Sequence, residues 1–205
     1  MVIRKLFKFC SGHIVRNCSS ERCRKSMHGH NYTVEVFFHS DKLDNGHMIY
    51  DFGLTKGTIK DFIDGFDHCW QMWSKEDKNF RKFIKSNSDR WIEMPCSPSA
   101  EQYSLMFLFV IDKILKATEF ANGEGKVKVH SVRVHETDTG YAESFRKDLK
   151  LVNYDLIDIK LSNQVQEEFG DKHMWHRLID YYEDIDTTGG CQKPFINQSI
   201  EQQVK

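Results

Sequence analysis

Apolar and polar residues alternate along two stretches near the N-terminus, as expected for half-buried strands. In residues 6–13, Phe7 and Phe9 alternate with polar neighbours. In residues 28–38, one face would hold only histidine, aromatic and aliphatic side chains, namely His28, His30, Tyr32, Val34, Val36 and Phe38. The intervening residues 18–27 are polar and predict a loop. The pattern therefore predicts two strands joined by a long connection.

The following segment predicts a turn, a short strand and a helix. The Asn45-Gly46 pair is a strong signal for a tight hairpin turn. Residues 48–52 are expected to return as a strand, and residues 53–66 carry apolar side chains at near-helical spacing. Residues 70–91 are charged and irregular, with short helical pieces as their expected content.

A second helix and two further strands complete the pattern. Residues 97–118 begin with a Pro-Ser pair that suits a helix start and then run apolar for several turns. A turn is expected at 121–125, followed by strands at 126–137 and 141–145. This order of elements indicates an α+β protein with an antiparallel sheet.

The pattern changes after about Lys150. Residues 154–161 predict a further strand and residues 165–185 a helix, whereas residues 187–205 are polar and expected to be loose at their end. We therefore predict one domain over residues 1–150 and a C-terminal extension over residues 151–205.

Composition and charge narrow the classes of function. Hydrophobic residues make up 40% of the 205 residues and charged residues 29%, a balance typical of globular proteins. The formal net charge of -1 predicts no general attraction to nucleic acid or to an anionic membrane, and no apolar run is long enough to span one. The N-terminus has no signal-peptide pattern, and the six cysteines show no CxxC spacing. These features predict a cytoplasmic protein with free thiols.

Three histidines suggest a metal site. His28 and His30 stand two residues apart on a predicted strand, so their side chains point the same way. His13 ends the preceding predicted strand and would lie beside His28. Three histidines with an open fourth position are typical of a catalytic zinc site. The alternative is that these histidines are polar residues satisfied within the fold.

A thiol and an Asp-His pair suggest proton transfer. Cys23 lies in the loop before His28, where a cation could stabilise its thiolate, and Cys18 in the same loop competes for this role. Asp67 directly precedes His68, and an aspartate can orient an imidazole that acts as a base. The alternative interpretations are that Cys23 is an ordinary free thiol and that His68 caps the C-terminal end of a helix.

Six segments in order, FCSGH, CRKSMHGHNYTVEV, GHMIYDFGLTK, FDHCW, SPSAEQ and VRVHET, resemble the family of 6-pyruvoyl-tetrahydropterin and 6-carboxytetrahydropterin synthases. The resemblance covers about residues 7–145. It implies the tunnelling fold (T-fold), in which two hairpins form a four-stranded antiparallel sheet with two helices on one face. Subunits of that fold assemble into an oligomeric β-barrel, commonly as trimers that stack into hexamers.

The resemblance also implies roles for individual residues. It implies that Zn²⁺ is bound by His13, His28 and His30, and that a proton-transfer triad, often assembled across a subunit boundary, consists of Cys23, Asp67 and His68. It implies that Glu136 anchors the pterin ring in a pocket shared with Thr137, Ser99 and Glu101. Ser99 also fits a helix N-cap, and Glu101 suits a first helical turn without any ligand.

From the resemblance we expect a zinc-dependent 6-carboxytetrahydropterin synthase. Its substrate would be 7,8-dihydroneopterin triphosphate, and its products 6-carboxy-5,6,7,8-tetrahydropterin, acetaldehyde and triphosphate, on the path to queuosine. The expectation rests on the absence of a targeting signal and on a likeness to bacterial members. The alternatives are a 6-pyruvoyltetrahydropterin synthase, which eliminates triphosphate and keeps the carbon chain, and a zinc- or pterin-binding protein without turnover.

Overall fold

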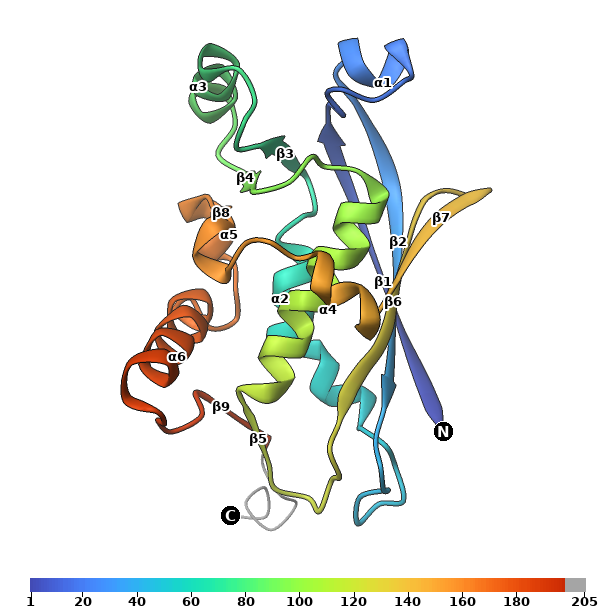
Figure 1. Cartoon of the computed structure of the whole chain (residues 1–205), viewed down its shortest axis with the longest axis vertical. Coiled ribbons are helices and arrows are strands. Elements are labelled where there is room, and N and C mark those ends of the chain that lie inside the picture. Colours follow the sequence, from blue (N-terminus) through green and yellow to red (C-terminus); the bar gives the residue numbers. More distant parts are fainter. Residues whose placement is uncertain (198–205) are drawn as a thin grey trace.

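The computed structural model describes residues 1–197, and its elements are labelled in Figure 1. The strands are β1 (Val2–His13), β2 (His28–His39), β3 (Cys69–Trp73), β4 (Trp91–Met94), β5 (Thr118–Phe120), β6 (Lys128–Thr137), β7 (Gly140–Phe145), β8 (Lys160–Leu161) and β9 (Phe195–Asn197). The α-helices are α1 (Glu21–Lys25), α2 (Thr58–Asp64), α3 (Lys78–Asn87), α4 (Ala100–Lys116), α5 (Asn163–Glu167) and α6 (Met174–Thr188). Short 3-10 helices are η1 (Phe52–Lys56), η2 (Arg146–Leu151) and η3 (Leu156–Asp158). The chain is therefore an α+β protein.

One mixed sheet of seven strands organises the fold, in the order β7-β6-β2-β1-β3-β4-β8. Neighbours among β7, β6, β2 and β1 are antiparallel, as predicted for the two hairpins. The predicted sheet of four strands is incomplete, because β3 and β4 continue it in parallel and β8 closes it. These added strands have five, four and two residues, which is too short for alternation to be recognised in a charged segment.

The first hairpin is long and regular. Its register runs from the pair Val2 and His39 to the pair His13 and His28 without a bulge. On one face, Phe9 and Tyr32 stack with ring centroids 4.8 Å apart and are almost fully buried. Burial of this apolar face sets the register, since a shift by one residue would turn every core side chain toward solvent.

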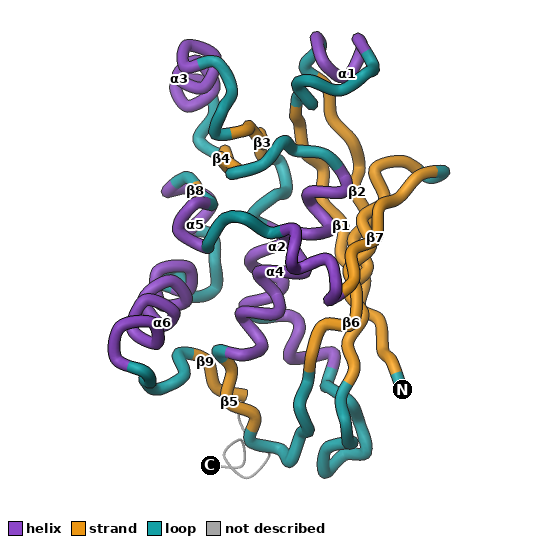
Figure 2. The backbone as a smooth tube through the Cα atoms, viewed as in Figure 1, coloured by secondary structure: helices purple, strands orange, loops and turns teal. Residues whose placement is uncertain are grey.

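Two helices cover one face of the four antiparallel strands, as Figures 1 and 2 show. These are α2 and α4, and α4 is buried along most of its 17 residues. Ser99 caps α4 by accepting a hydrogen bond from the Gln102 N–H, as the sequence predicted. The two helices and the sheet therefore enclose the main hydrophobic core.

The segment after Lys150 forms a third layer outside α2 and α4 (Figure 1). Trp175 of α6 stacks on Phe62 of α2, with the ring planes 8° and the centroids 5.4 Å apart. Both side chains belong to the hydrophobic cluster that also contains Phe9. The predicted boundary at residue 150 stays a prediction, and residues 198–205 of the predicted extension lie outside the described residues.

Several of the predicted elements differ in the structure. The predicted loop at 18–27 contains α1, and the predicted helix at 165–185 is divided into α5 and α6. Residues 48–52 form no strand, because β6 occupies the edge of β2 where they would have paired, and Ile49 and Tyr50 are buried from a loop instead. The predicted helix at 53–66 is divided at Gly57 into η1 and α2. Residues 154–161 are mainly η3, with a strand only at β8.

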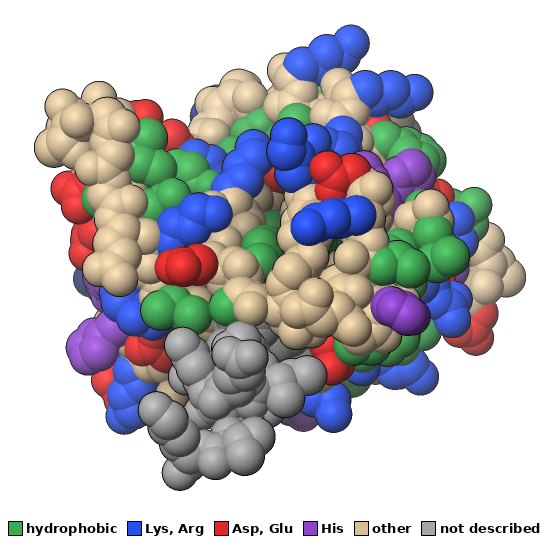
Figure 3. Space-filling view, turned by 90° about the horizontal axis from the view of Figure 1, so that it is seen from below, with side chains coloured by type: hydrophobic (Ala, Val, Ile, Leu, Met, Phe, Trp, Pro, Cys, Tyr) green, Lys and Arg blue, Asp and Glu red, His purple; other side chains and the backbone are tan. Residues whose placement is uncertain are grey.

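Basic and acidic side chains lie next to each other on the end of the molecule where the N-terminus lies (Figure 3). Among the described residues, no helix is both long and apolar enough to cross a membrane.

The stack of Trp175 on Phe62 generates a prediction about stability. Trp175 is 3% exposed, so Trp175→Ala should lower the free energy of unfolding by about 3–5 kcal/mol through lost burial and a cavity. The control Ile157→Ala, at a side chain that is 57% exposed, should change it by less than about 0.5 kcal/mol. Chemical denaturation measures both values. Equal small effects would show that the third layer contributes little to cooperative folding.

Candidate functional site

Three histidines meet where the β1–β2 hairpin ends. His13 lies directly opposite His28 in the register, and His30 is two residues further along the same face of β2. One ring nitrogen from each of the three lies within 4.8 Å of the others. The backbones approach closely here, since a Cβ on Gly29 would lie 2.5 Å from the Ser11 carbonyl oxygen. The glycine between the two histidines is therefore needed for this hairpin to close.

Backbone carbonyls orient two of the three imidazole rings. His13 Nδ1 donates to the Pro98 carbonyl at 2.6 Å, and His28 Nδ1 donates to the Ser26 carbonyl at 2.9 Å. These hydrogen bonds leave Nε2 of each ring free to face the other, and the two Nε2 atoms are 3.1 Å apart. Two nitrogens bound to one ion at 2.0–2.1 Å would be about 3.3 Å apart. The observed separation thus fits a shared metal ion, with outer hydrogen bonds of the kind that metal-binding histidines use.

Burial keeps His13 in the neutral form that can bind a metal ion. The pKa of His13 is lowered to about 4, mainly because burial removes solvent from the ring. The hydrogen bond to Pro98 acts to raise this pKa, and the nearby His28 and His30 act to lower it. His13 is therefore neutral at pH 7, the form in which imidazole binds a metal. Three imidazoles whose ring nitrogens lie this close together are a donor set that a divalent cation satisfies.

Glu136 and Tyr32 lie beside the histidines. Glu136 Oε1 is 3.8 Å from Nε2 of both His13 and His30, and it accepts a hydrogen bond of 3.3 Å from the Tyr32 hydroxyl. Burial and the Glu136 charge raise the pKa of Tyr32, so this hydroxyl remains a donor. Sequence reasoning placed Tyr32 on the histidine face but did not assign it to the site. The alternation of residues 28–38 was the signal that could have done so.

A cavity of about 400 Å³ opens next to the histidines. The sequence predicted its two cysteines, its two glutamates, Ser99 and Thr137, which come from three separate segments. The lining includes Val15, Cys18, Ser20, Cys23, His28, Ser99, Ala100, Glu101, Glu136, Thr137, Gly140 and Tyr141. All four predicted substrate-binding residues and both candidate thiols therefore face one space, although their roles stay predictions.

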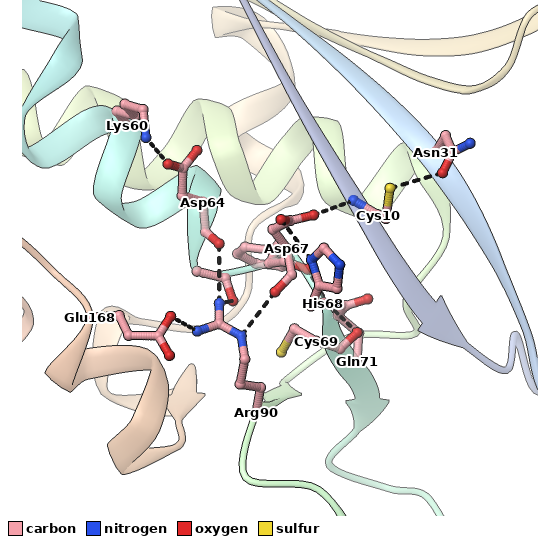
Figure 4. A network of polar contacts seen from close by, with 12 residues as sticks. Cys10, Asn31, Lys60, Asp64, Asp67, His68, Cys69, Gln71, Arg90 and Glu168 are labelled. Atoms are coloured by element: carbon pink, nitrogen blue, oxygen red, sulfur yellow. Dashed lines mark hydrogen bonds and ion pairs between the residues drawn. The ribbon is translucent and has the colours of Figure 1, made fainter.

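Asp67 and His68 form a hydrogen-bonded pair, shown in Figure 4. His68 Nδ1 donates to Asp67 Oδ2 at 2.8 Å, and Asp67 Oδ1 accepts from the Cys10 N–H at 2.6 Å. Burial acts to raise the pKa of Asp67, but the hydrogen bonds from Cys10 and His68 outweigh it and lower that pKa. These neighbours in sequence can face each other because His68 has a φ of +48°, in the left-handed region that non-glycine residues seldom adopt.

The structure does not bring the predicted triad together within one chain. His68 lines a second cavity of about 740 Å³ with Cys10, Asn31 and Trp70, whereas Cys23 lines the first. Among the described residues, no hydrogen bond joins Cys23 to Asp67 or His68. His28 lines both cavities, so the two parts of the predicted site lie on either side of it.

Arg90 supports the Asp67–His68 pair, and sequence reasoning missed it. Its Nε donates to the Asp67 carbonyl at 3.0 Å, and the guanidinium also reaches the carbonyls of Asp64 and Gly65 (Figure 4). No sequence signal marks this arginine, because its role depends on where β4 lies relative to the end of α2.

Together, the mixed sheet and the three histidines define an α+β protein with a site competent to bind a metal ion. The family of 6-pyruvoyl tetrahydropterin synthases matches residues 2–147. The chain belongs to this family.

Two relatives extend the comparison. The 6-carboxy-5,6,7,8-tetrahydropterin synthase of Helicobacter pylori strain J99 is 46% identical over 183 residues, covering 87% of this chain and 92% of the relative. The protein of the same description from Aquifex aeolicus is 30% identical over 159 residues, covering 69% of this chain and 95% of the relative. Sequence similarity to the first therefore continues well beyond residue 147.

Solved structures show the same fold. An uncharacterized protein from Wolinella succinogenes has a TM-score of 0.55 at 21% identity, covering 71% of this chain and 98% of that chain. The 6-pyruvoyltetrahydropterin synthase of Plasmodium vivax has a TM-score of 0.51 at 17% identity, with the same coverage. At these identities the likeness concerns the fold alone.

The histidine geometry generates a prediction about metal binding. His28→Ala removes one of three converging nitrogens and should weaken divalent-metal binding by at least about 100-fold, above the 10–100-fold typical of losing an outer hydrogen-bond partner. His39→Ala, at the other end of the same strand, serves as the control and should leave the affinity unchanged. Metal analysis with competitive chelators measures both. Full metal content at unchanged affinity in His28→Ala would reject the site.

Proposed function

We propose that this protein is a zinc-dependent 6-carboxytetrahydropterin synthase. It would convert 7,8-dihydroneopterin triphosphate to 6-carboxy-5,6,7,8-tetrahydropterin, acetaldehyde and triphosphate, in queuosine biosynthesis. The observation that carries the proposal is the cavity in which Cys23, His28 and Glu136 meet. The 46% identity to the Helicobacter pylori protein of that description supports this choice of reaction.

Zinc suits the site because its ligands would be three neutral imidazoles and one open position. His13, His28 and His30 would hold the ion. When bound, it would supply Lewis acidity that lowers the pKa of the substrate side-chain hydroxyls. Tyr32 and Glu136, joined by their hydrogen bond, border the histidine cluster and would shape the space in which those hydroxyls lie.

Glu136 would select the pterin ring. The ring presents two N–H donors on one edge, and a carboxylate can accept both in a bidentate, charge-assisted arrangement. Thr137 follows Glu136 at the end of β6, while Ser99 and Glu101 enter the cavity from the start of α4. The ring would therefore be held between the end of the sheet and the N-terminus of a helix.

Cys23, Asp67 and His68 would transfer protons at the substrate side chain. Because Cys23 and His68 line different cavities of one chain, we propose that the triad is completed by a second copy. A homo-oligomer built from trimers, such as a hexamer of two stacked trimers, would provide that copy. Cys18 remains the alternative thiol, because it lines the same cavity as Cys23.

A 6-pyruvoyltetrahydropterin synthase is the second candidate, and the description of the matching family favours it. Both reactions begin with proton shifts at the side chain. They diverge when a retro-aldol type of cleavage breaks the carbon chain in the first reaction and not in the second. A metal- and pterin-binding protein without turnover is the third candidate. The cytoplasmic location stays a prediction from the sequence.

Product analysis tests the proposed reaction. Purified, zinc-loaded protein incubated with 7,8-dihydroneopterin triphosphate should release acetaldehyde and a carboxylated tetrahydropterin, detected by chromatography and mass spectrometry. A pyruvoyl pterin without acetaldehyde would support the second candidate. Unchanged substrate would support the third.

The thiol assignment gives a separate prediction. Cys23→Ala should lower kcat by at least about 100-fold, within the range that one acid–base group contributes, while zinc content and pterin binding persist. Cys18→Ala is the matched control from the same loop and should stay within about threefold of the parent protein. Steady-state kinetics and metal analysis compare the two. A larger loss in Cys18→Ala would transfer the role to Cys18.

A further inference from the structure

The turn from Asp64 to His68 is held by a residue outside it. Arg90 directly precedes β4, and its side chain is 17% exposed. It donates to the carbonyl of Asp67 at 3.0 Å and to those of Asp64 and Gly65 at 3.3 Å. The last carbonyls of a helix lack partners within the helix, and here one guanidinium supplies them. The Arg90 side chain thus adds to the backbone hydrogen bond from the Trp70 N–H to the Arg90 carbonyl in joining the turn that carries His68 to the start of β4.

The guanidinium is in turn held by the segment after Lys150. Its Nη1 forms an ion pair with Glu168, which follows the last residue of α5 (Figure 4). The other oxygen of Glu168 accepts from Gln164 Nε2 at 2.7 Å, which orients the carboxylate. Glu168 therefore fixes the direction in which Arg90 presents its remaining donors.

Packing brings the same segment against the same turn. A Cβ on Gly65 would lie 3.0 Å from Val165 Cγ1 and 3.4 Å from Phe169, so both side chains press on the backbone two residues before Asp67. The Gly170 N–H also donates to Asp61 Oδ2 at 3.1 Å. Residues 165–170 thus contact the end of α2 through apolar packing and a hydrogen bond. They also reach the turn after α2 through the ion pair of Glu168 with Arg90.

The His68 ring depends on this support. Its side chain is 80% exposed, and its ring is held by the hydrogen bond from Nδ1 to Asp67. The backbone of His68 adopts its positive φ only while the surrounding turn enforces it. Any loosening of the turn would therefore change where the imidazole points.

We infer that Arg90 and Glu168 are positioning residues for the Asp67–His68 pair, so that the C-terminal segment becomes part of the catalytic apparatus. The inference rests on the proposed function, in which His68 transfers a proton. The segment acts on the reaction without contacting the substrate, through the carbonyl of Asp67.

The chain offers a matched pair of variants for the test. Glu168 and Glu167 are adjacent, and both form ion pairs, but the partner of Glu167 among residues 1–197 is Lys172, within the C-terminal segment. Glu168→Ala should lower kcat about fivefold or more, as small displacements of a catalytic group do, with KM changed by less than about twofold. Glu167→Ala should change neither value.

Amide hydrogen exchange gives a readout that needs no substrate. In the zinc-loaded protein, residues 64–68 should exchange faster in Glu168→Ala than in Glu167→Ala, while the metal content of both matches the parent protein. This measurement also separates two failures. If the parent protein does not turn over dihydroneopterin triphosphate, the proposed function fails, and exchange at residues 64–68 still decides the positioning role.

A double variant shows whether Glu168 acts through Arg90. Arg90→Lys should lower kcat more than Glu168→Ala, because an ammonium cannot reach three carbonyls and a carboxylate in the geometry of a guanidinium. The combined variant should then equal Arg90→Lys alone. If Arg90→Lys fails to fold, the half-exposed Glu168 still gives the comparison with Glu167.

Three results would overturn the inference. The first is a Glu168→Ala variant that matches Glu167→Ala in both kcat and exchange. The second is a loss of kcat that merely follows a loss of metal or of melting temperature. The third is a double variant whose losses multiply, which would mean that the two residues act independently.

Discussion

The register of the β1–β2 hairpin is the constraint on which the rest of the site depends. It places His13 directly opposite His28, and the alternation of the strand adds His30 on the same face. Gly29 permits the close approach of the two backbones, because no side chain fits beside the Ser11 carbonyl. The same alternation that buries Phe9 against the helices therefore directs three imidazoles to one point. The core and the metal-competent site are specified by one pattern.

The two parts of the site differ in their exposure to solvent and therefore in the chemistry that suits them. His13 is buried, and loss of water keeps it neutral and suited to bind a cation. His68 is exposed and backed by Asp67, an arrangement that suits an imidazole that must gain and lose a proton. In one chain these parts line different cavities, which is the physical reason for proposing that a second copy completes the reaction centre.

The segment after Lys150 contacts both the hydrophobic core and the turn that carries His68. Trp175 joins the core through Phe62, while Glu168 reaches the turn before His68 through Arg90. The contacts that anchor the third layer are therefore continuous with those that hold the exposed imidazole.

Sequence by itself determined the elements with strong periodicity and the residues on their faces. The strands β1, β2, β6 and β7, the helix α4 and the shared face of His28 and His30 follow from patterns of two or 3.6 residues, because burial of one face acts locally along the chain. The Ser99 cap follows from its spacing to Gln102. Only tertiary structure decided the rest. The short strands β3, β4 and β8 form because β1 leaves one edge of the sheet available for pairing. Residues 48–52 form no strand, because β6 already pairs with the edge of β2 that they would have used. Arg90 gained its role because α2 ends beside β4, a contact between segments that no local pattern encodes.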